Sequence, residues 1–283
     1  MLTPASSKIR SIVASRRRAR PRAAVGLINR GIGLPFMWLP WAFAADATMR
    51  ASTGAKRYRG LLELGSKFLI SYLIGSLMGS MIIGGLKGGV DIREQGSGNA
   101  GGTNALRTQG FVFALGVIAV DIGKGVVGAG LIPGLELPFV PTDPEISRIW
   151  LTLSCAAATV IGHVWPIYYR FRGGKGAATL VGTLIILGPK LILPMLLMWA
   201  WVLVMSGYVG LSTMTSAIAL PIWLAATQLP EQEPLFIYCV VMAVFIVYCH
   251  RSNIRRMRNG TEHRNNRLML FRRKGKASND DGP

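Results

Sequence analysis

The sequence predicts an all-α integral membrane protein, a seven-transmembrane-helix bundle whose cytoplasmic glycine-rich loops form the functional site. Of the 283 residues, 51% are hydrophobic and only 16% are charged, whereas a soluble domain usually carries about 25% charged residues. The apolar residues gather in stretches of membrane length, because a helix needs about 20 mostly apolar residues to cross the hydrocarbon core. Polar, glycine-rich segments with positive charge join some of these stretches.

Seven stretches are candidate membrane spans. They cover approximately residues 67–86, 110–132, 148–168, 176–188, 190–208, 211–229 and 234–249. The fourth is short and contains Gly182, so it can tilt, thin the bilayer locally or pack inside the bundle. It meets the fifth at Gly188-Pro189, a tight-turn signal. Small residues inside the first two spans, such as Gly75 and Gly125, permit close helix packing.

Positive charge gathers at the two ends of the chain. Twelve of the 32 Lys and Arg residues lie in residues 1–66, and ten lie in 250–283. Anionic lipid headgroups attract such basic ends, so the net charge of +19 predicts membrane lipid as a partner. This distribution argues against nucleic acid, which a soluble protein would bind through a basic patch on one face.

Loop charge predicts the orientation of the spans. The segments at 87–109 and 169–176 and the C-terminal tail each carry several Lys or Arg residues. The segments at 133–147 and 230–233 carry acidic residues and neither Lys nor Arg. Seven spans place these two sets on opposite sides, and the positive-inside rule assigns the basic set to the cytoplasm. The basic N-terminus conflicts with this topology, because the first span would then begin outside.

Three regions are expected: a basic N-terminal extension at 1–65, a membrane domain at 66–263, and a C-terminal tail at 264–283 that is first basic and then disordered. Within the extension, residues 31–45 are apolar but short and contain two prolines. This stretch can be a signal-like region, an interfacial helix or an additional span. A start of translation further along the chain is another explanation for a basic N-terminal segment that does not fit the predicted topology.

A polar, glycine-rich loop between the first two spans is the most informative segment. Its glycines let the backbone approach a ligand closely, and its N–H groups, hydroxyls and amides can together face an anion. A phosphate monoester offers three strong acceptor oxygens and favours several converging donors, some of them cationic. The loop is therefore predicted to bind phosphate, with a flexible connector as the alternative. The candidate residues are Arg93, Gly96, Ser97, Gly98, Asn99, Gly101, Thr103, Asn104 and Arg107.

A second segment of the same character, 170–176, joins the third and fourth spans. Lys175 stands between glycines and is expected to be an exposed cation, whose compact ammonium suits a phosphate oxygen. His163 ends the third span, and three cations follow it within a dozen positions. A structural and a functional role for this histidine are both open. The candidates here are His163, Gly173, Gly174, Lys175 and Gly176.

Several further polar residues lie in or beside the spans. Asp121 and Lys124 share one helical face in the second span, where they form either an ion pair that holds helices together or a substrate contact. Thr213 lies at a cytoplasmic turn, where hydroxyls often bond their own backbone. His250 and Asn253 share a face if the helix continues past the last span, although a basic segment lying on the headgroups is the simpler interpretation.

The sequence lacks the motifs that are typical of several reaction classes. There is no nucleophile elbow, no nucleoside-triphosphate P-loop and no carboxylate and histidine cluster with metal-ligand spacing. The three cysteines have no CxxC or CxxH spacing. We therefore expect no metal, no cofactor and no strongly activated protein nucleophile.

Four segments resemble, in order and spacing, the motifs of the bacterial membrane-integral acyl-phosphate:glycerol-3-phosphate acyltransferases. They are GVDIRxxGSGNxGxTNxxR at 89–107, DxxKG at 121–125, GHxxP and FxGGKGxAT within 162–179, and HRxNI and GTE within 250–262. Ala100, Gly102, Cys249 and Ser252 depart from the family pattern. We assign no catalytic part to positions 249 and 252.

The resemblance implies a seven-helix enzyme of the bacterial inner membrane with a site that faces the cytoplasm. Such an enzyme transfers an acyl chain from acyl-phosphate to the 1-hydroxyl of glycerol 3-phosphate, giving lysophosphatidic acid and phosphate, as the first step of phospholipid synthesis. The family uses no acyl-CoA or acyl carrier protein directly, no metal and no cofactor. The implied partners are the two substrates, membrane lipid and the enzyme that produces acyl-phosphate.

Two phosphate-bearing substrates require two anion pockets. We expect Ser97, Asn99, Thr103, Asn104 and Arg107 to hold one phosphate with Lys175 and Thr213, and Arg93, Lys124, His250 and Asn253 to hold the other. The base for the glycerol hydroxyl is either His163 or a phosphate oxygen of the donor. A transporter or flippase for a phosphorylated solute is the rival class, although the internal repeat typical of transporters is not visible. A third and weaker alternative is a non-catalytic, lipid-anchored scaffold.

Overall fold

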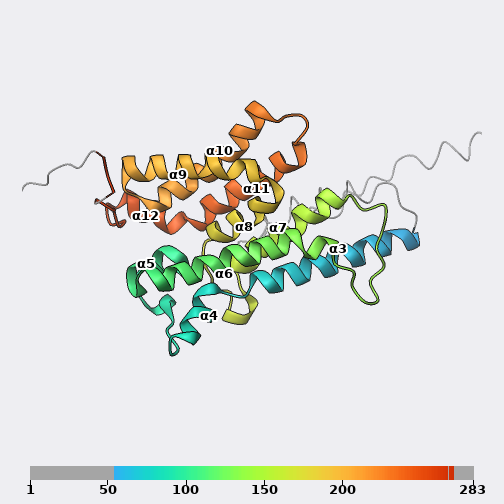
Figure 1. Ribbon diagram of the computed structural model, residues 1–283, viewed down its shortest axis with the longest axis horizontal. Coiled ribbons are helices and arrows are strands. Elements are labelled where there is room, and N and C mark those ends of the chain that lie inside the picture. The colour runs from blue at the N-terminus through green and yellow to red at the C-terminus, as the bar shows by residue number, and fades with distance from the viewer. Residues whose placement is uncertain (1–53, 267, 271–283) are drawn as a thin grey trace, which may run out of the picture. The chain divides into compact units, whose positions relative to one another are not determined.

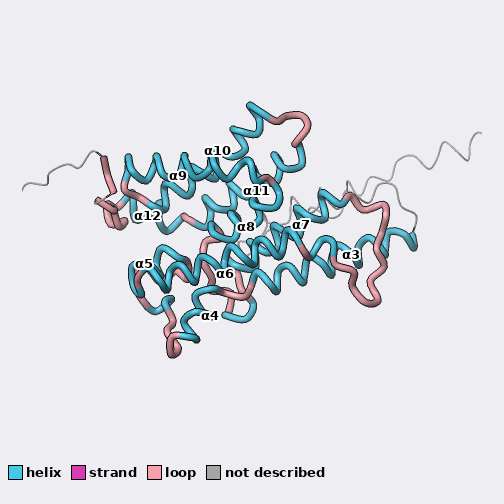
Figure 2. Tube along the Cα trace, viewed as in Figure 1, coloured by secondary structure: helices cyan, strands magenta, loops and turns pink. Residues whose placement is uncertain are grey.

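A computed structural model describes residues 54–266 and 268–270, and this part of the chain is helical and has no strand (Figures 1 and 2). The predictions for residues 31–45 and for the end of the tail fall outside the described residues. The α-helices are α3 (Gly54–Gly75), α4 (Gly79–Leu86), α5 (Gly102–Gln109), α6 (Phe111–Gly130), α7 (Arg148–Val164), α8 (Ala177–Leu187), α9 (Ile192–Ser206), α10 (Val209–Thr227), α11 (Glu233–Cys249) and α12 (Arg251–Arg258).

Four apolar segments of the described chain are long enough to cross a membrane, and up to six if each of two bent helix pairs counts as one span. The four segments are Phe111–Gly134, Arg148–Tyr169, Pro189–Ser206 and Val209–Thr227. The bent pairs are α3 with α4, at 43°, and α11 with α12, at 52°. The expected fourth span is α8, which has only 11 residues and is too short to count by length.

The expected first span, 67–86, differs most from the structure because it consists of two helices. α3 ends at Gly75 and α4 begins at Gly79. The side chain of Lys124 donates a hydrogen bond of 2.7 Å to the carbonyl of Leu77 within this break. A broken helix in an apolar surrounding leaves carbonyls without intrahelical partners, so this lysine satisfies one of them.

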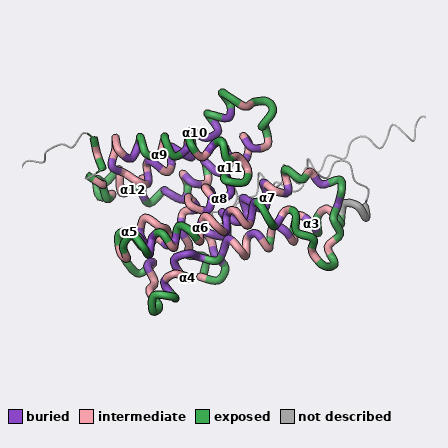
Figure 3. The backbone as a smooth tube through the Cα atoms, viewed as in Figure 1, coloured by how far each residue is buried: buried purple, intermediate pink, exposed green. Residues whose placement is uncertain are grey.

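Glycines bring the helices into close contact, as their frequency in the sequence predicts. A methyl group added at Gly75 of α3 would lie 2.8 Å from the Cα atom of Thr159 in α7. A methyl group added at Gly125 of α6 would lie 3.0 Å from the Cα atom of Gly182 in α8. Close backbone packing therefore holds α3 on α7 and the short α8 on α6. Among the four segments long enough to cross a membrane, Arg148–Tyr169, which contains α7, has the largest buried share, 78% (Figure 3).

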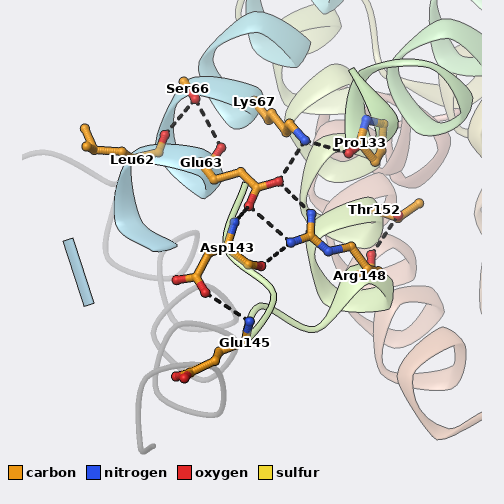
Figure 4. Close-up of polar contacts among 9 residues, drawn as sticks. All are labelled: Leu62, Glu63, Ser66, Lys67, Pro133, Asp143, Glu145, Arg148 and Thr152. Carbon is orange, nitrogen blue, oxygen red and sulfur yellow. Dashed lines mark hydrogen bonds and ion pairs between the residues drawn. The ribbon is translucent and has the colours of Figure 1, made fainter. Parts of the chain in front are cut away.

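A buried ion network fixes the start of α3 to the loop before α7 (Figure 4). Glu63 is 1% exposed. Its carboxylate accepts hydrogen bonds from Lys67 Nζ at 2.8 Å, from Arg148 Nη1 at 2.6 Å and from the backbone N–H of Asp143 at 2.8 Å. Lys67 also donates to the carbonyl of Pro133 at 2.8 Å. The expected boundary between residues 65 and 66 therefore lies inside α3, whose preceding turns belong to the packed domain.

Polar segments of different character lie at opposite ends of the helices. In Figure 1, α5 and α12 lie at one end of the bundle, whereas the start of α3 and the loop between α6 and α7 lie at the other. The end with α5 and α12 contains the first glycine-rich segment and the basic stretch after α11. This arrangement brings the predicted site residues to one end of the bundle.

Candidate active site

A single pocket collects residues from both glycine-rich segments, from the start of α10 and from the bend between α11 and α12. Twelve of the predicted site residues line it: Ser97, Asn99, Gly101, Thr103, Asn104, Arg107, His163, Lys175, Gly176, Thr213, His250 and Asn253. Segments separated by more than 150 positions in the sequence thus meet in one cavity. Six predicted residues lie outside the lining: Arg93, Gly96, Gly98, Lys124, Gly173 and Gly174.

Asn104 organises the first glycine-rich loop from within. Its amide Nδ2 donates to the carbonyls of Ile92 at 2.8 Å and Gln95 at 3.0 Å. Its Oδ1 accepts from the N–H of Ser97 at 2.9 Å and from the hydroxyl of Ser97 at 3.2 Å. The side chain is 1% exposed, so its main observed role is to hold the loop in shape. Gly96 has φ of +57°, and an added methyl group there would lie 2.5 Å from Oδ1 of Asn104.

The start of α5 adds donors to the pocket wall. α5 begins at Gly102, and Gly101 precedes it in extended conformation. Gly101, Gly102 and Thr103 all line the pocket. Because the first N–H groups of a helix have no intrahelical acceptor, a helix start attracts anions. Arg107, one turn further on, also lines the pocket, and burial lowers the pKa of its guanidinium.

Lys175 is not the exposed, mobile cation that the sequence suggests. Its Nζ donates to Oδ1 of Asn253, and the residue is half-buried. Asn253 Nδ2 in turn donates to Glu262 Oε1 at 2.7 Å, and Arg256 Nε donates to Glu262 Oε2 at 2.6 Å. Burial, followed by repulsion from Arg256, lowers the pKa of Lys175 to about 8. The pocket therefore contains a cation that titrates close to physiological pH.

Asp121 and His163 face each other at the buried wall of the pocket. Both line the cavity, and His163 Nδ1 lies 3.3 Å from Asp121 Oδ1 without meeting hydrogen-bond geometry. Oδ1 also accepts from the N–H of Gly79 at 3.2 Å and pairs with Lys124 Nζ at 3.0 Å. Lys124 lies outside the pocket lining and bonds the broken α3–α4 segment. The Asp121–Lys124 ion pair lies within α6, and the hydrogen bonds of its members to Gly79 and Leu77 tie α6 to the broken α3–α4 segment.

Arg93 connects the two glycine-rich segments from outside the pocket. Its Nη2 pairs with Asp91 Oδ2 at 2.6 Å, and this hydrogen-bonded carboxylate raises the pKa of Arg93. Its Nη1 donates to the carbonyls of Tyr169 at 3.4 Å and Arg172 at 3.3 Å, and the guanidinium lies over the Tyr169 ring. Since its donors are engaged by these groups, Arg93 positions the second segment against the first.

Gly173 and Gly174 pack against the end of α7. The N–H of Gly174 donates to the carbonyl of His163 at 3.1 Å, and an added methyl group at Gly174 would clash with the imidazole of His163. An added methyl group at Gly173 would lie 2.6 Å from Cδ of Pro166. These glycines let the second segment lie directly on the histidine.

Two other predicted residues make local hydrogen bonds. The hydroxyl of Thr213 donates to the carbonyl of Val209 at 3.0 Å and lies 3.3 Å from Nε1 of Trp199, which donates to it. His250 Nδ1 lies 2.8 Å from the carbonyl of Ile246. Because a carbonyl only accepts, Nδ1 carries the proton and Nε2 is free to accept.

The pocket also contains eight residues beyond the predicted site residues, among them Asp121, for which the sequence left a substrate contact open. They are Gly102, Asp121, Ala177, Ala178, Val209, Gly210, Arg256 and Glu262. Arg256 follows Asn253 by three positions and therefore lies on the same helical face. This spacing could have identified it, but several neighbouring arginines make one functional arginine hard to distinguish by sequence. Glu262 lies in the GTE segment of the third motif, and its hydrogen bonds to Asn253 and Arg256 are visible only in the structure.

The arrangement is suited to holding anions beside a buried imidazole. Arg107, Lys175 and Arg256 supply positive charge from three separate elements, and Glu262 offsets part of it. Among residues 54–266 and 268–270, no group of three His, Cys, Asp or Glu side chains is placed to hold a metal ion. Three cations and the start of α5 around one pocket favour electrostatic stabilisation of phosphate groups.

Known proteins are similar to this chain in sequence and in fold. Residues 66–260 match the model of the glycerol-3-phosphate acyltransferase family. The glycerol-3-phosphate acyltransferase of Chlorobaculum tepidum is 36% identical over 219 residues, which cover 69% of this chain and 94% of the relative. That of Bacillus velezensis is 38% identical over 194 residues, which cover 69% and 93%.

Two crystal structures of PlsY, an integral membrane glycerol 3-phosphate acyltransferase, also resemble this chain. The glycerol 3-phosphate form is 32% identical with a TM-score of 0.62, and the match covers 71% of this chain and 94% of that one. The lysophosphatidic acid form is 31% identical with a TM-score of 0.61 and the same coverage.

Proposed function

The chain belongs to the glycerol-3-phosphate acyltransferase family, and from this premise we propose that it takes its acyl group from acyl-phosphate. As an integral membrane acyltransferase, it acylates glycerol 3-phosphate. The proposed acceptor is the 1-hydroxyl, and the products are lysophosphatidic acid and inorganic phosphate. Acyl-phosphate is an activated donor, so the enzyme mainly needs to align two substrates and stabilise developing charge.

The observation that carries this proposal is the meeting of three cations in one pocket. Arg107 comes from α5, Lys175 from the second glycine-rich segment and Arg256 from α12. A phosphate monoester carries a charge of about −1.5 to −2 at pH 7, so two phosphate-bearing substrates need several cations between them. Ser97, Asn99 and the start of α5 then orient the phosphate oxygens through hydrogen bonds.

The proposed reaction is a direct transfer between the two substrates. The oxygen of the 1-hydroxyl attacks the carbonyl carbon of acyl-phosphate, a carbon–oxygen ester bond forms, and the bond from that carbon to the phosphate oxygen breaks. Phosphate leaves with the electron pair, and Lys175 and Arg107 offset its growing negative charge. The hydroxyl proton passes to His163, next to the carboxylate of Asp121, or to an oxygen of the donor phosphate.

His163→Ala distinguishes the two routes for the proton. If the imidazole is the base, turnover should fall by about 10²–10⁴-fold, the range typical of general-base catalysis. Turnover close to that of the parent protein would assign the proton to the donor phosphate. Thermal unfolding of the variant and of the parent protein checks that the space left by the missing imidazole in α7 has not unfolded the protein.

We further propose seven spans, with the site at the cytoplasmic face of the bacterial inner membrane. α8, the fourth span in chain order, would complete the seven as a short helix that crosses the membrane with its neighbours packed around it. The buried hydroxyls of Thr183 in α8 and Tyr238 in α11 lie 2.9 Å apart, which supports such packing. Single cysteines placed at Glu136 and at Gly98 should react with impermeant reagents from opposite sides. Labelling of both from one side would rule out this topology.

A phosphate-release assay tests the proposed donor. Purified protein in nanodiscs receives palmitoyl-phosphate or palmitoyl-CoA, with and without glycerol 3-phosphate. With palmitoyl-phosphate we expect lysophosphatidic acid and a release of phosphate that depends on glycerol 3-phosphate. With palmitoyl-CoA we expect neither. Transfer from palmitoyl-CoA at the same rate would refute the donor assignment, and absence of any acceptor-dependent product would favour a transporter.

A further inference from the structure

α12 has two faces that both carry arginine, and only one of them belongs to the pocket. The inner face presents Asn253 and Arg256, which bond Lys175 and Glu262. The outer face presents Arg251, Arg255 and Arg258, all exposed. Their spacing of four and three positions aligns these three guanidinium groups along one stripe of the helix.

The outer stripe has little negative charge to balance it. Within the described residues, Arg255 and Arg258 form no ion pair, and Arg251 bonds only the carbonyl of Tyr248, at 3.3 Å, and stacks over its ring. Like charges three and four positions apart on a helix repel each other. The three outer arginines of α12 therefore repel one another, and anions from outside the chain would relieve this repulsion.

The position of α12 puts this stripe where a bilayer presents anions. The apolar helix α11 ends at Cys249, and α12 begins at Arg251 after a bend of 52°. The bend turns α12 away from the axis of the spanning helix directly where the apolar sequence ends. Tyr248, 45% exposed, lies at this junction. Exposed aromatic rings and arginines at the end of a span are typical of the headgroup region.

We propose that Arg251, Arg255 and Arg258 form a binding surface for the headgroups of anionic phospholipids in the surrounding bilayer. Planar guanidinium groups bind phosphate oxygens in pairs, and a stripe of three matches several lipid phosphates along the membrane plane. The same helix positions Asn253 and Arg256 in the pocket, so bound lipid would restrain one wall of the site. This surface is independent of which acyl donor the pocket takes.

The test measures lipid selectivity with the full chain and does not depend on turnover. Electron spin resonance of spin-labelled phosphatidylglycerol and phosphatidylcholine gives the relative association of each lipid with the protein in phosphatidylcholine nanodiscs. The test variant is Arg255→Gln/Arg258→Gln. The control variant, Arg59→Gln/Lys190→Gln, removes the same charge from exposed positions near the start of α3 and in the turn between α8 and α9. Thermal unfolding is compared for all three proteins.

We expect the parent protein and the control to prefer phosphatidylglycerol, and the test variant to lose about fivefold in selectivity per arginine removed. Added NaCl should weaken the preference by screening. Equal selectivity in the test variant and the parent, or an equal loss in the control, would overturn the proposal. Loss of the preference with inorganic phosphate but not with NaCl of equal ionic strength would instead indicate a site for soluble anions.

Discussion

The charge of Lys175 gives the sharpest prediction about the proposed site. Burial and the neighbouring Arg256 lower its pKa to about 8, so the free enzyme carries the ammonium at pH 7 and loses it as the pH rises through 8. With that pKa, about 90% of the side chain is charged at pH 7 and about 10% at pH 9. If only the ammonium form holds a substrate phosphate, kcat/KM should fall about tenfold between these two values.

The pH dependence of kcat should differ from that of kcat/KM. A bound phosphate favours the charged lysine and raises its pKa, so kcat should stay nearly constant from pH 7 to pH 9, since kcat reports groups in the substrate complex. Lys175→Arg keeps its charge throughout and should remove the fall in kcat/KM, whatever its absolute activity. Initial rates at saturating glycerol 3-phosphate and varied palmitoyl-phosphate give kcat and the kcat/KM for the donor. A flat kcat/KM in the parent protein, or an unchanged fall in Lys175→Arg, would refute the role of this ammonium.

Three further substitutions test other parts of the structure. Glu63→Ala leaves the buried ammonium of Lys67 and the exposed guanidinium of Arg148 without their carboxylate and should destabilise the fold by about 3–5 kcal/mol; an unchanged unfolding midpoint would contradict the network in Figure 4. Gly174→Ala should displace the imidazole of His163 and reduce kcat strongly, whereas Gly123→Ala, with open space around it, should leave kcat unchanged. Arg93→Gln should raise KM for glycerol 3-phosphate with little effect on the unfolding midpoint, because it frees the second glycine-rich segment; an unchanged KM would argue against this connection.

Twelve of the proposed site residues line one pocket, and the sequence could indicate them because their chemistry is local. Glycine, asparagine and arginine at fixed spacing in the segment containing Ser97 and Arg107 indicate an anion-binding loop on their own. Loop charge indicates which segments lie together, and the pocket does join that loop to Lys175 and Asn253. The family resemblance agrees with the comparisons over residues 66–260.

Other features depend on contacts that a linear pattern does not contain. The exposure of Lys175 was overestimated because Asn253, which accepts its hydrogen bond, lies 78 positions away. The break between α3 and α4 lies in a continuous apolar stretch, and its stabilisation by Lys124 depends on how α6 packs. Hydropathy does predict the short helix α8 at 176–188, but it does not reveal that the hydroxyl of Thr183 lies against that of Tyr238, 55 positions away.

Transfer of an isotopic label tests the central claim most directly. Purified protein in nanodiscs receives palmitoyl-phosphate and glycerol 3-phosphate that carries ¹⁸O in its 1-hydroxyl. The account predicts that the label remains in the ester of lysophosphatidic acid and that the released phosphate carries none. Lys175→Ala should reduce the rate by about 10²-fold or more, and Lys190→Ala should not. Failure to form labelled lysophosphatidic acid, or full activity in Lys175→Ala, would contradict the account.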